Sequence, residues 1–130
     1  MKKRFYVTQY AIVFKNRKLL LLKDNCHTKV RGKWVFPGGH IDMEDPITAL
    51  GREIKEELGC SLIKASLFKT CVKKYASGWR YVVYYKCSID KIKIKLSNEH
   101  SEYKWASLKD VKNMKFRDSN EKQLIIELLK

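Results

Sequence analysis

The segment 45-DPITALGREIKEELG-59 constrains the fold of this chain most, because it carries both ends of a helix. Asp45 suits the N-cap, Pro46 suits the first helical position, and Gly59 suits the position just past the end. Between them, four apolar side chains recur at helical spacing: Ile47, Leu50, Ile54 and Leu58. The sequence therefore predicts a helix over residues 46–58 that packs one apolar face on a core.

The same helix concentrates negative charge in a chain whose formal net charge is +14. Glu53, Glu56 and Glu57 would lie within an arc of about 100° around the helix. Like charges at these spacings oppose the helix by roughly 0.2–0.5 kcal/mol per pair, and the helix dipole disfavours anions in the last turn. A solvated acidic face is the simplest explanation. However, the local cost favours a positive partner for these carboxylates.

The surroundings of the glutamates favour a divalent metal ion as that partner. Gly38 and Gly39 bring bare backbone close to the helix, and Glu44 precedes it. Carboxylates and a backbone carbonyl form a hard-oxygen site suited to Mg²⁺ or Mn²⁺. Mg²⁺ typically binds few protein ligands together with substrate phosphates, which agrees with basic residues elsewhere in the chain.

Most of the remaining chain is predicted to form strands. Apolar, β-branched and aromatic residues indicate strands over 5–14, 19–23, 34–40, 61–74, 79–89, 91–97 and 102–108. A hairpin turn is expected at 75–78, one helical turn at 110–114, and a C-terminal helix at 119–129. Strand 91–97 would expose its lysines, as an edge strand does. Without a linker or repeat, the sequence predicts one domain over residues 1–130.

Composition narrows the class of protein further. A hydrophobic fraction of 45% is typical of a folded domain, and no run of 18 apolar residues predicts a membrane span. The four cysteines are scattered and form no CxxC pair, which favours thiols in a reducing cytoplasm. The excess of basic residues favours polyanionic partners such as nucleotides or RNA.

The residues around the acidic helix resemble the Nudix box, GX5EX7REUXEEXGU. In this chain the pattern runs from Gly38 through Glu44 to 52-REIKEELGC-60, with every fixed position present. The one departure is Cys60, where a bulky aliphatic residue is usual; cysteine behaves as a small hydrophobe. The segments 34-WVFPGG-39 and 99-EHSEYKWASLKDV-111 are also similar to the family, so the resemblance covers nearly the whole chain.

The resemblance implies a Nudix fold of the α+β class, with a mixed β-sheet sandwiched between α-helices as α/β/α. It implies hydrolysis of a nucleoside diphosphate linked to another group, with Mg²⁺ or Mn²⁺ as cofactor. Arg52 would orient a box glutamate, and Glu44 would support the loop and the helix. The metal ligands it implies are Glu53, Glu56, Glu57 and a carbonyl of Gly38 or Gly39.

The general base varies within the family. A box glutamate or an acid from a later loop takes the proton from water. The candidates in this chain are Glu53, Glu56, Glu99 and Glu102. Because a hard-metal site does not need imidazole, three histidines are expected to be structural or solvent-facing: His27, His40 and His100.

Substrate markers downstream of the box are missing. ADP-ribose pyrophosphatases of the family often have a proline 15 residues after the box, where this chain has Tyr75. Dinucleoside polyphosphate hydrolases often have a tyrosine slightly later, where it has Ala76, Ser77 and Gly78. Elimination therefore favours a MutT-like nucleoside triphosphate pyrophosphohydrolase, which forms a nucleoside monophosphate and pyrophosphate.

Other functions remain as alternatives. The +14 charge favours an RNA 5′-end pyrophosphohydrolase, and a dinucleoside polyphosphate hydrolase is a further possibility within the family. A non-catalytic Nudix-fold nucleotide-binding module belongs to a different class. The intact box argues against the module, because such modules usually lose box glutamates.

Substrate contacts are expected from residues outside the box. Arg31, Lys33 and Arg80 could hold phosphates, although a solvated role suits them equally. MutT-like members place base-reading residues where this chain has Phe116, Asp118 and Asn120. Helix capping is the competing interpretation, through Asp118 with Glu121 or Asn120 with Gln123.

Overall fold

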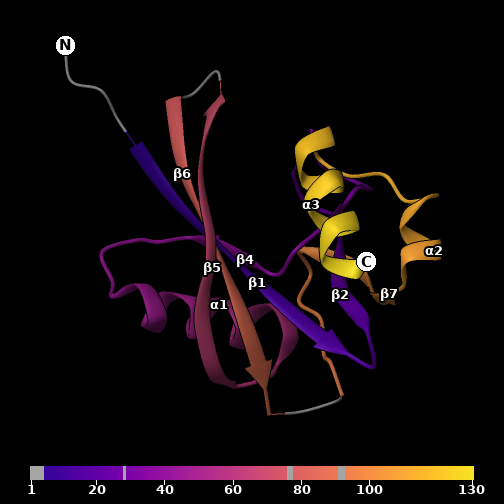
Figure 1. The fold of residues 1–130 in the computed structure, drawn as a ribbon. Coiled ribbons are helices and arrows are strands. Elements are labelled where there is room, and N and C mark those ends of the chain that lie inside the picture. Colours follow the sequence, from indigo (N-terminus) through magenta and orange to yellow (C-terminus); the bar gives the residue numbers. More distant parts are fainter. Residues whose placement is uncertain (1–4, 28, 76–77, 91–92) are drawn as a thin grey trace.

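The structure, a computed structural model, describes residues 5–27, 29–75, 78–90 and 93–130, and a mixed β-sheet forms its centre (Figure 1). The main strand order is β3 (Trp34–Val35), β2 (Lys18–Asp24), β1 (Phe5–Lys15), β6 (Gly78–Ile89) and β5 (Leu62–Tyr75). In addition, β4 (Gly38–His40) pairs with β1 and β7 (His100–Ala106) pairs with β2. β1 and β6 run parallel, whereas the other paired strands run antiparallel. The predicted mixed sheet is confirmed.

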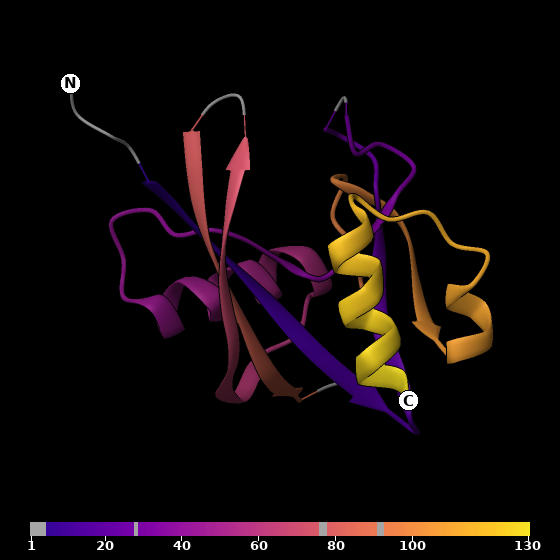
Figure 2. The ribbon, with the colours of Figure 1, turned by 45° about the horizontal axis from the view of Figure 1, so that its top comes forward.

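The two central strands divide the core between the faces of the sheet. Successive side chains of a strand point to opposite faces. In β1, Ile12 therefore packs toward α3 (Ser119–Leu129), whereas Ala11 packs toward α1 (Pro46–Leu58). The leucines of β2 divide in the same way and are fully buried: Leu19, Leu20, Leu21 and Leu22. Helices thus cover both faces, as the α/β/α expectation requires (Figure 2).

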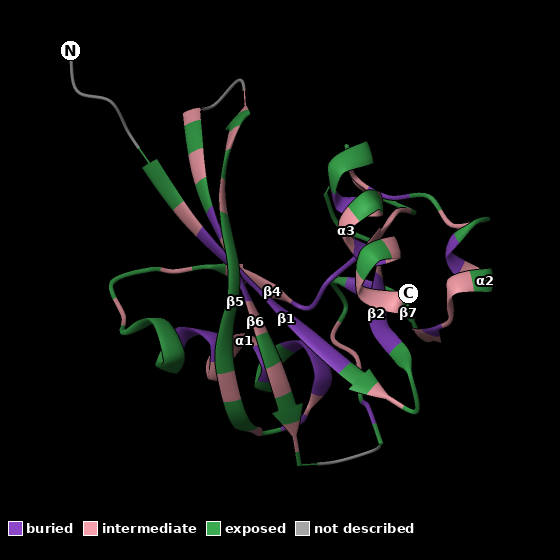
Figure 3. Cartoon of the chain, in the orientation of Figure 1, coloured by how far each residue is buried: buried purple, intermediate pink, exposed green. Residues whose placement is uncertain are grey.

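Helix α1 has the predicted bounds and ends at Gly59, whose φ of 69° is the left-handed conformation expected at a helix C-terminus. Three of the four predicted apolar residues are fully buried: Leu50, Ile54 and Leu58. Ile47 is the exception, because it lies in the first turn and remains 48% exposed. Buried residues concentrate on β1, β2 and the inner face of α1, whereas β5 is largely exposed (Figure 3).

The predicted edge strand over 91–97 is wrong for its described part. Lys91 and Ile92 lie outside the described residues, and residues 93–97 form no strand. Instead, the N–H of Lys95 donates to the carbonyl of Leu58 at 2.9 Å. This bond satisfies one of the carbonyls that a helix C-terminus leaves without an internal partner. Ile94 is still buried, so the alternating pattern placed its side chain correctly without a strand.

Other boundaries shift for local reasons. The predicted strand 34–40 divides into β3 and β4, because the carbonyl of Pro37 between them accepts from Ala11. β7 ends at Ala106 because Ser107 caps α2 (Leu108–Val111), which replaces the turn expected at 110–114. Helix α3 matches the prediction.

The hairpin between β5 and β6 was expected to turn at 75–78. Residues 75 and 78 pair with each other, whereas Ala76 and Ser77 lie outside the described residues. Among the helices that the structure describes, none has the length and apolar character needed to cross a membrane.

Candidate functional site

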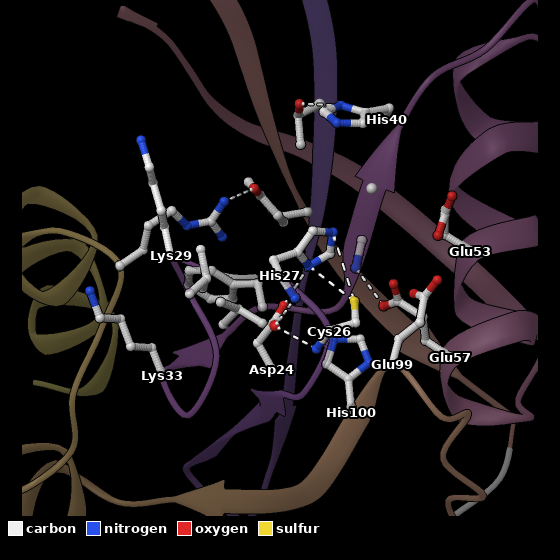
Figure 4. A pocket seen from close by; sticks show the side chains of 18 of the residues that line it. Asp24, Cys26, His27, Lys29, Lys33, His40, Glu53, Glu57, Glu99 and His100 are labelled. Carbon is white, nitrogen blue, oxygen red and sulfur yellow. Dashed lines mark hydrogen bonds and ion pairs between the residues drawn. The ribbon is translucent and has the colours of Figure 1, made fainter. Parts of the chain in front are cut away.

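A pocket of about 1020 Å³ opens beside α1 and the central strands. The carboxylates of Glu53 and Glu57 lie at one end of it, and the ammonium groups of Lys29 and Lys33 lie at the other (Figure 4). Its volume is slightly above the range of about 300–1,000 Å³ that small-molecule sites usually occupy. The pocket is therefore large enough for a nucleotide-sized ligand. Its lining carries negative charge at one end and positive charge at the other.

Glu57 lies on the inner side of α1 and is 3% exposed. Its Oε1 accepts a hydrogen bond from the N–H of Gly38 at 2.9 Å. Burial raises the pKa of Glu57 to about 9, and the carboxylates of Glu53 and Glu99 raise it further, whereas the Gly38 bond lowers it. A divalent cation would offset the cost of burying the ionised carboxylate, because a nearby positive charge favours the ionised form.

Glu53 lies against the backbone of Gly39. A Cβ at residue 39 would stand 2.8 Å from the Cδ of Glu53, so a larger side chain would displace the carboxylate. Burial raises the pKa of Glu53, and Arg52 partly offsets that rise. Carboxylate oxygens thus lie at one end of the pocket beside the half-buried backbone of Gly38 and Gly39, and oxygen atoms are the ligands that a hard divalent cation prefers.

Arg52 joins the remaining box carboxylates. Its Nε and Nη2 donate to the two oxygens of Glu44 at 2.9 and 2.6 Å. Its Nη1 lies 3.1 Å from Glu53 and 3.3 Å from Glu56. The Arg52 bonds hold the pKa of Glu44 below its usual value. At Glu53 and Glu56, Arg52 therefore offsets part of the repulsion expected from the sequence.

Three further predicted residues also reach the pocket, namely Glu99, Lys33 and Arg80. Glu102 does not line it, because its carboxylate pairs with the Nζ of Lys23 at 3.2 Å. Arg31 is exposed and also lies outside the pocket lining. The structure thus brings Glu99 close to the box glutamate Glu57, whereas Glu102 lies in β7 and outside the pocket lining.

The three residues expected to read the base do not line the pocket. Phe116 is buried in the core, where its backbone bridges to Trp34. Asp118 caps α3 by accepting from the N–H of Glu121 at 2.8 Å, so the capping interpretation is confirmed for this residue. Asn120 is exposed on the first turn of α3.

Arg117 reaches the pocket from the same segment, although nothing in the sequence pattern indicated it. Its guanidinium carbon lies 5.0 Å from the ring centroid of Tyr10, and its Nη1 donates to the Tyr10 hydroxyl at 2.5 Å. Behind it, the buried carboxylate of Glu121 lies 3.5 Å from Nη2. Packing and ion pairing thus fix the position of a cation on the pocket wall.

The three histidines, which were expected to be structural or solvent-facing, also line the pocket. His40 bonds to Thr8 at 3.0 Å through Nδ1 and to Arg80 at 3.3 Å through Nε2. His27 lies 2.8 Å from Asp24, and His100 is buried at the start of β7. The positions of His40 and His100 depend on pairing of β4 with β1 and of β7 with β2, which the sequence did not reveal.

The burial of Glu57 predicts that stability falls with rising pH when divalent ions are removed. The carboxyl has a pKa of about 9 in the folded chain and 4.5 as its reference value. Between these pH values the folded state keeps a proton that the unfolded state has released, so higher pH favours unfolding by up to about 1.4 kcal/mol per unit. Urea unfolding in EDTA at several pH values between 5 and 9 measures this slope.

A pair of variants tests whether Glu57 causes the slope. Glu57→Gln removes the titrating group while its amide oxygen can still accept from Gly38, so the slope is expected to flatten. Glu127→Gln, at an exposed position on α3, is expected to keep it. An unchanged slope in Glu57→Gln would contradict the assignment.

Comparison with known proteins shows the family of this chain. The NUDIX domain matches residues 5–128. An 8-oxo-dGTP diphosphatase of Buchnera aphidicola is 30% identical over 112 residues, which cover 85% of this chain and 83% of the relative. The nucleoside triphosphatase NudI of Klebsiella pneumoniae is 31% identical, covering 63% of this chain and 66% of the relative.

A solved structure shows that the fold matches as well. The MutT protein of Methanosarcina mazei superposes with a TM-score of 0.83 at 22% identity, covering 98% of this chain and 95% of that protein. The matched domain spans the box carboxylates, Arg52 and the glycine pair whose geometry is described above. The chain therefore belongs to the Nudix family as a MutT-like Nudix hydrolase.

Proposed function

We propose that the chain acts as a single Nudix domain over residues 1–130 that hydrolyses nucleoside triphosphates to nucleoside monophosphates and pyrophosphate. The observation that carries this proposal is the pocket, with box carboxylates at one end and basic side chains at the other. The names of two relatives, an 8-oxo-dGTP diphosphatase and a nucleoside triphosphatase, support it.

The acidic end would hold Mg²⁺ or Mn²⁺. In this proposal the ligands are Glu53, Glu56, Glu57 and a backbone carbonyl of Gly38 or Gly39. These oxygen donors fit a hard cation, and burial of Glu57 leaves its charge in need of one. When bound, the ion would neutralise phosphate charge and lower the pKa of the attacking water.

Glu53 is the general base that the geometry favours. Arg52 holds its carboxylate in place at 3.1 Å, and the side chain lines the pocket beside the other box glutamates, within reach of a substrate bound there. Glu53 would take a proton from water while the water oxygen bonds to phosphorus. The anhydride bond between the α- and β-phosphates breaks at the attacked phosphorus. The leaving group, pyrophosphate or nucleoside monophosphate according to which of the two phosphorus atoms the water attacks, keeps the electron pair.

The basic end would bind the rest of the nucleotide. Lys33 and Arg80 line the pocket and are proposed to contact phosphate oxygens. Arg117 and Tyr10 form a rigid cationic and aromatic wall, which suits the nucleoside. Phe116, Asp118 and Asn120, which were expected to read the base, do not line this pocket.

A product assay tests the proposal. The purified chain is incubated with Mg²⁺ and a panel of nucleoside triphosphates, oxidised nucleotides, ADP-ribose, dinucleoside polyphosphates and 5′-triphosphorylated RNA. We expect the highest kcat/KM with a nucleoside triphosphate, and monophosphate and pyrophosphate as products. Higher activity on RNA that falls steeply with salt would support the RNA alternative. Tight nucleotide binding without turnover in either metal would instead support the binding module.

A further inference from the structure

A second group of possible metal ligands borders the box carboxylates. A carboxylate oxygen of Glu57, one of Glu99 and a ring nitrogen of His100 all lie within 4.8 Å of one another. Figure 4 shows these side chains grouped at the acidic end of the pocket. Ligands on opposite sides of an ion with bonds of about 2.1 Å are about 4.2 Å apart. Small side-chain rotations would therefore bring all three into contact with one ion.

His100 gives independent evidence for a ligand at this position. The residue is 8% exposed, and its Nδ1 is buried without a hydrogen-bond partner among the residues that the structure describes. A buried polar group without a hydrogen-bond partner is unfavourable, because it has lost its bonds to water. A cation held by the imidazole and the adjacent carboxylates would give this buried nitrogen a partner.

A nitrogen ligand changes which ion the position prefers. Mg²⁺ favours oxygen ligands, whereas imidazole suits Zn²⁺ and other first-row transition ions. We propose that Glu57, Glu99 and His100 form a mixed nitrogen and oxygen site that binds Zn²⁺ or Co²⁺ in preference to Mg²⁺. This inference rests on the proposed function through Glu57, which the hard-cation site would share.

The cluster of Asp24, Cys26 and His27 is a nearby competitor and a useful control. Its members already contact one another, with His27 Nδ1 2.8 Å from Asp24 Oδ2 and 3.2 Å from Cys26 Sγ. The side chain of His27 is also mostly exposed to solvent. This cluster thus lacks the buried, unpartnered nitrogen that distinguishes His100.

Nitrogen-15 NMR of the histidine side chains tests the inference without an activity measurement. The chain has three histidines, so the variants His27→Gln and His40→Gln assign the His100 signals by elimination. With one equivalent of Zn²⁺, the His100 imidazole nitrogen is expected to shift, and excess Mg²⁺ is expected to produce no such shift. Because Glu99 is a proposed direct ligand, Glu99→Gln is expected to weaken Zn²⁺ binding by at least the roughly 10–100-fold that loss of an outer-shell partner causes. This design does not require a His100 variant that folds.

Two outcomes would overturn the inference. Zn²⁺ could shift His27 instead of His100, which would place the ion in the competing cluster, or it could shift no imidazole signal. The proposed function is measured separately by Mg²⁺-dependent hydrolysis in the same preparation. Loss of hydrolysis with an intact Zn²⁺ signal would refute the proposed function alone, and the reverse result would refute the mixed site alone.

Discussion

Glu53→Gln is expected to lower kcat by about 10²–10⁴-fold, which is the contribution usual for a general base. The change removes the proposed proton acceptor and also one carboxylate of the proposed metal site. The fold should survive, because the amide oxygen of glutamine can still accept the bond from Arg52 Nη1, which is 3.1 Å away in the native protein. Steady-state kinetics with a nucleoside triphosphate and saturating Mg²⁺, together with circular dichroism, measure both effects.

Glu102→Gln is the matched control for this experiment. Glu102 was also a candidate base, but its carboxylate pairs with Lys23 outside the pocket. Its substitution is expected to leave kcat nearly unchanged, because Glu102 does not line the pocket and an exposed ion pair contributes little to stability. A larger loss in Glu102→Gln than in Glu53→Gln would refute the assignment of the base.

Gly38→Ala is expected to lower the free energy of unfolding by about 2–6 kcal/mol, from backbone strain together with overpacking. Gly38 has a φ of 149°, which side chains rarely adopt. An added Cβ would lie 2.0 Å from the carbonyl oxygen of Gln9 and 2.9 Å from the Cα of Tyr10. Both atoms belong to the backbone of β1, which is paired with other strands and has no room to move.

Gly32→Ala separates the effect of steric contact with an added Cβ from the effect of a positive φ. Gly32 also has a positive φ, of 82°, but an added Cβ would meet nothing within 4 Å. Its substitution is expected to cost about 1–2 kcal/mol, the usual penalty for a left-handed residue. Urea unfolding of both variants measures the difference. Equal stabilities would show that the contact between Gly38 and β1 does not limit the side chain.

The helix and most strands were predictable because their signals are local. Residues 46–58 carry their own cap residues, and the C-terminal helix at 119–129 was also predicted correctly. The segment 91–97 has an equally clear alternating pattern, yet its described part forms no strand. Alternation shows which side chains face inward, but it does not show whether a neighbouring strand is available for pairing. Here Lys95 bonds to the end of α1 instead.

The residues of the candidate site also differ in whether local spacing or tertiary packing brings them together. The glutamates of one helix could be grouped from spacing alone, because residues three and four apart share a helix face. Arg117 could not be identified, because its place on the pocket wall depends on Tyr10 and Glu121. His100 could not be identified either, because its neighbour Glu57 is distant in the sequence.

By itself, the sequence determined the acidic helix, the glycine pair that approaches it and the family to which they belong, because these features depend on short spacings along one chain segment. Tertiary structure decided which other residues join them. Pairing of β4 with β1 places Gly38 beside Glu57, and pairing of β7 with β2 positions the segment that carries Glu99 and His100. Such contacts depend on the packing of distant segments around a shared core, and a linear pattern carries no direct record of that packing.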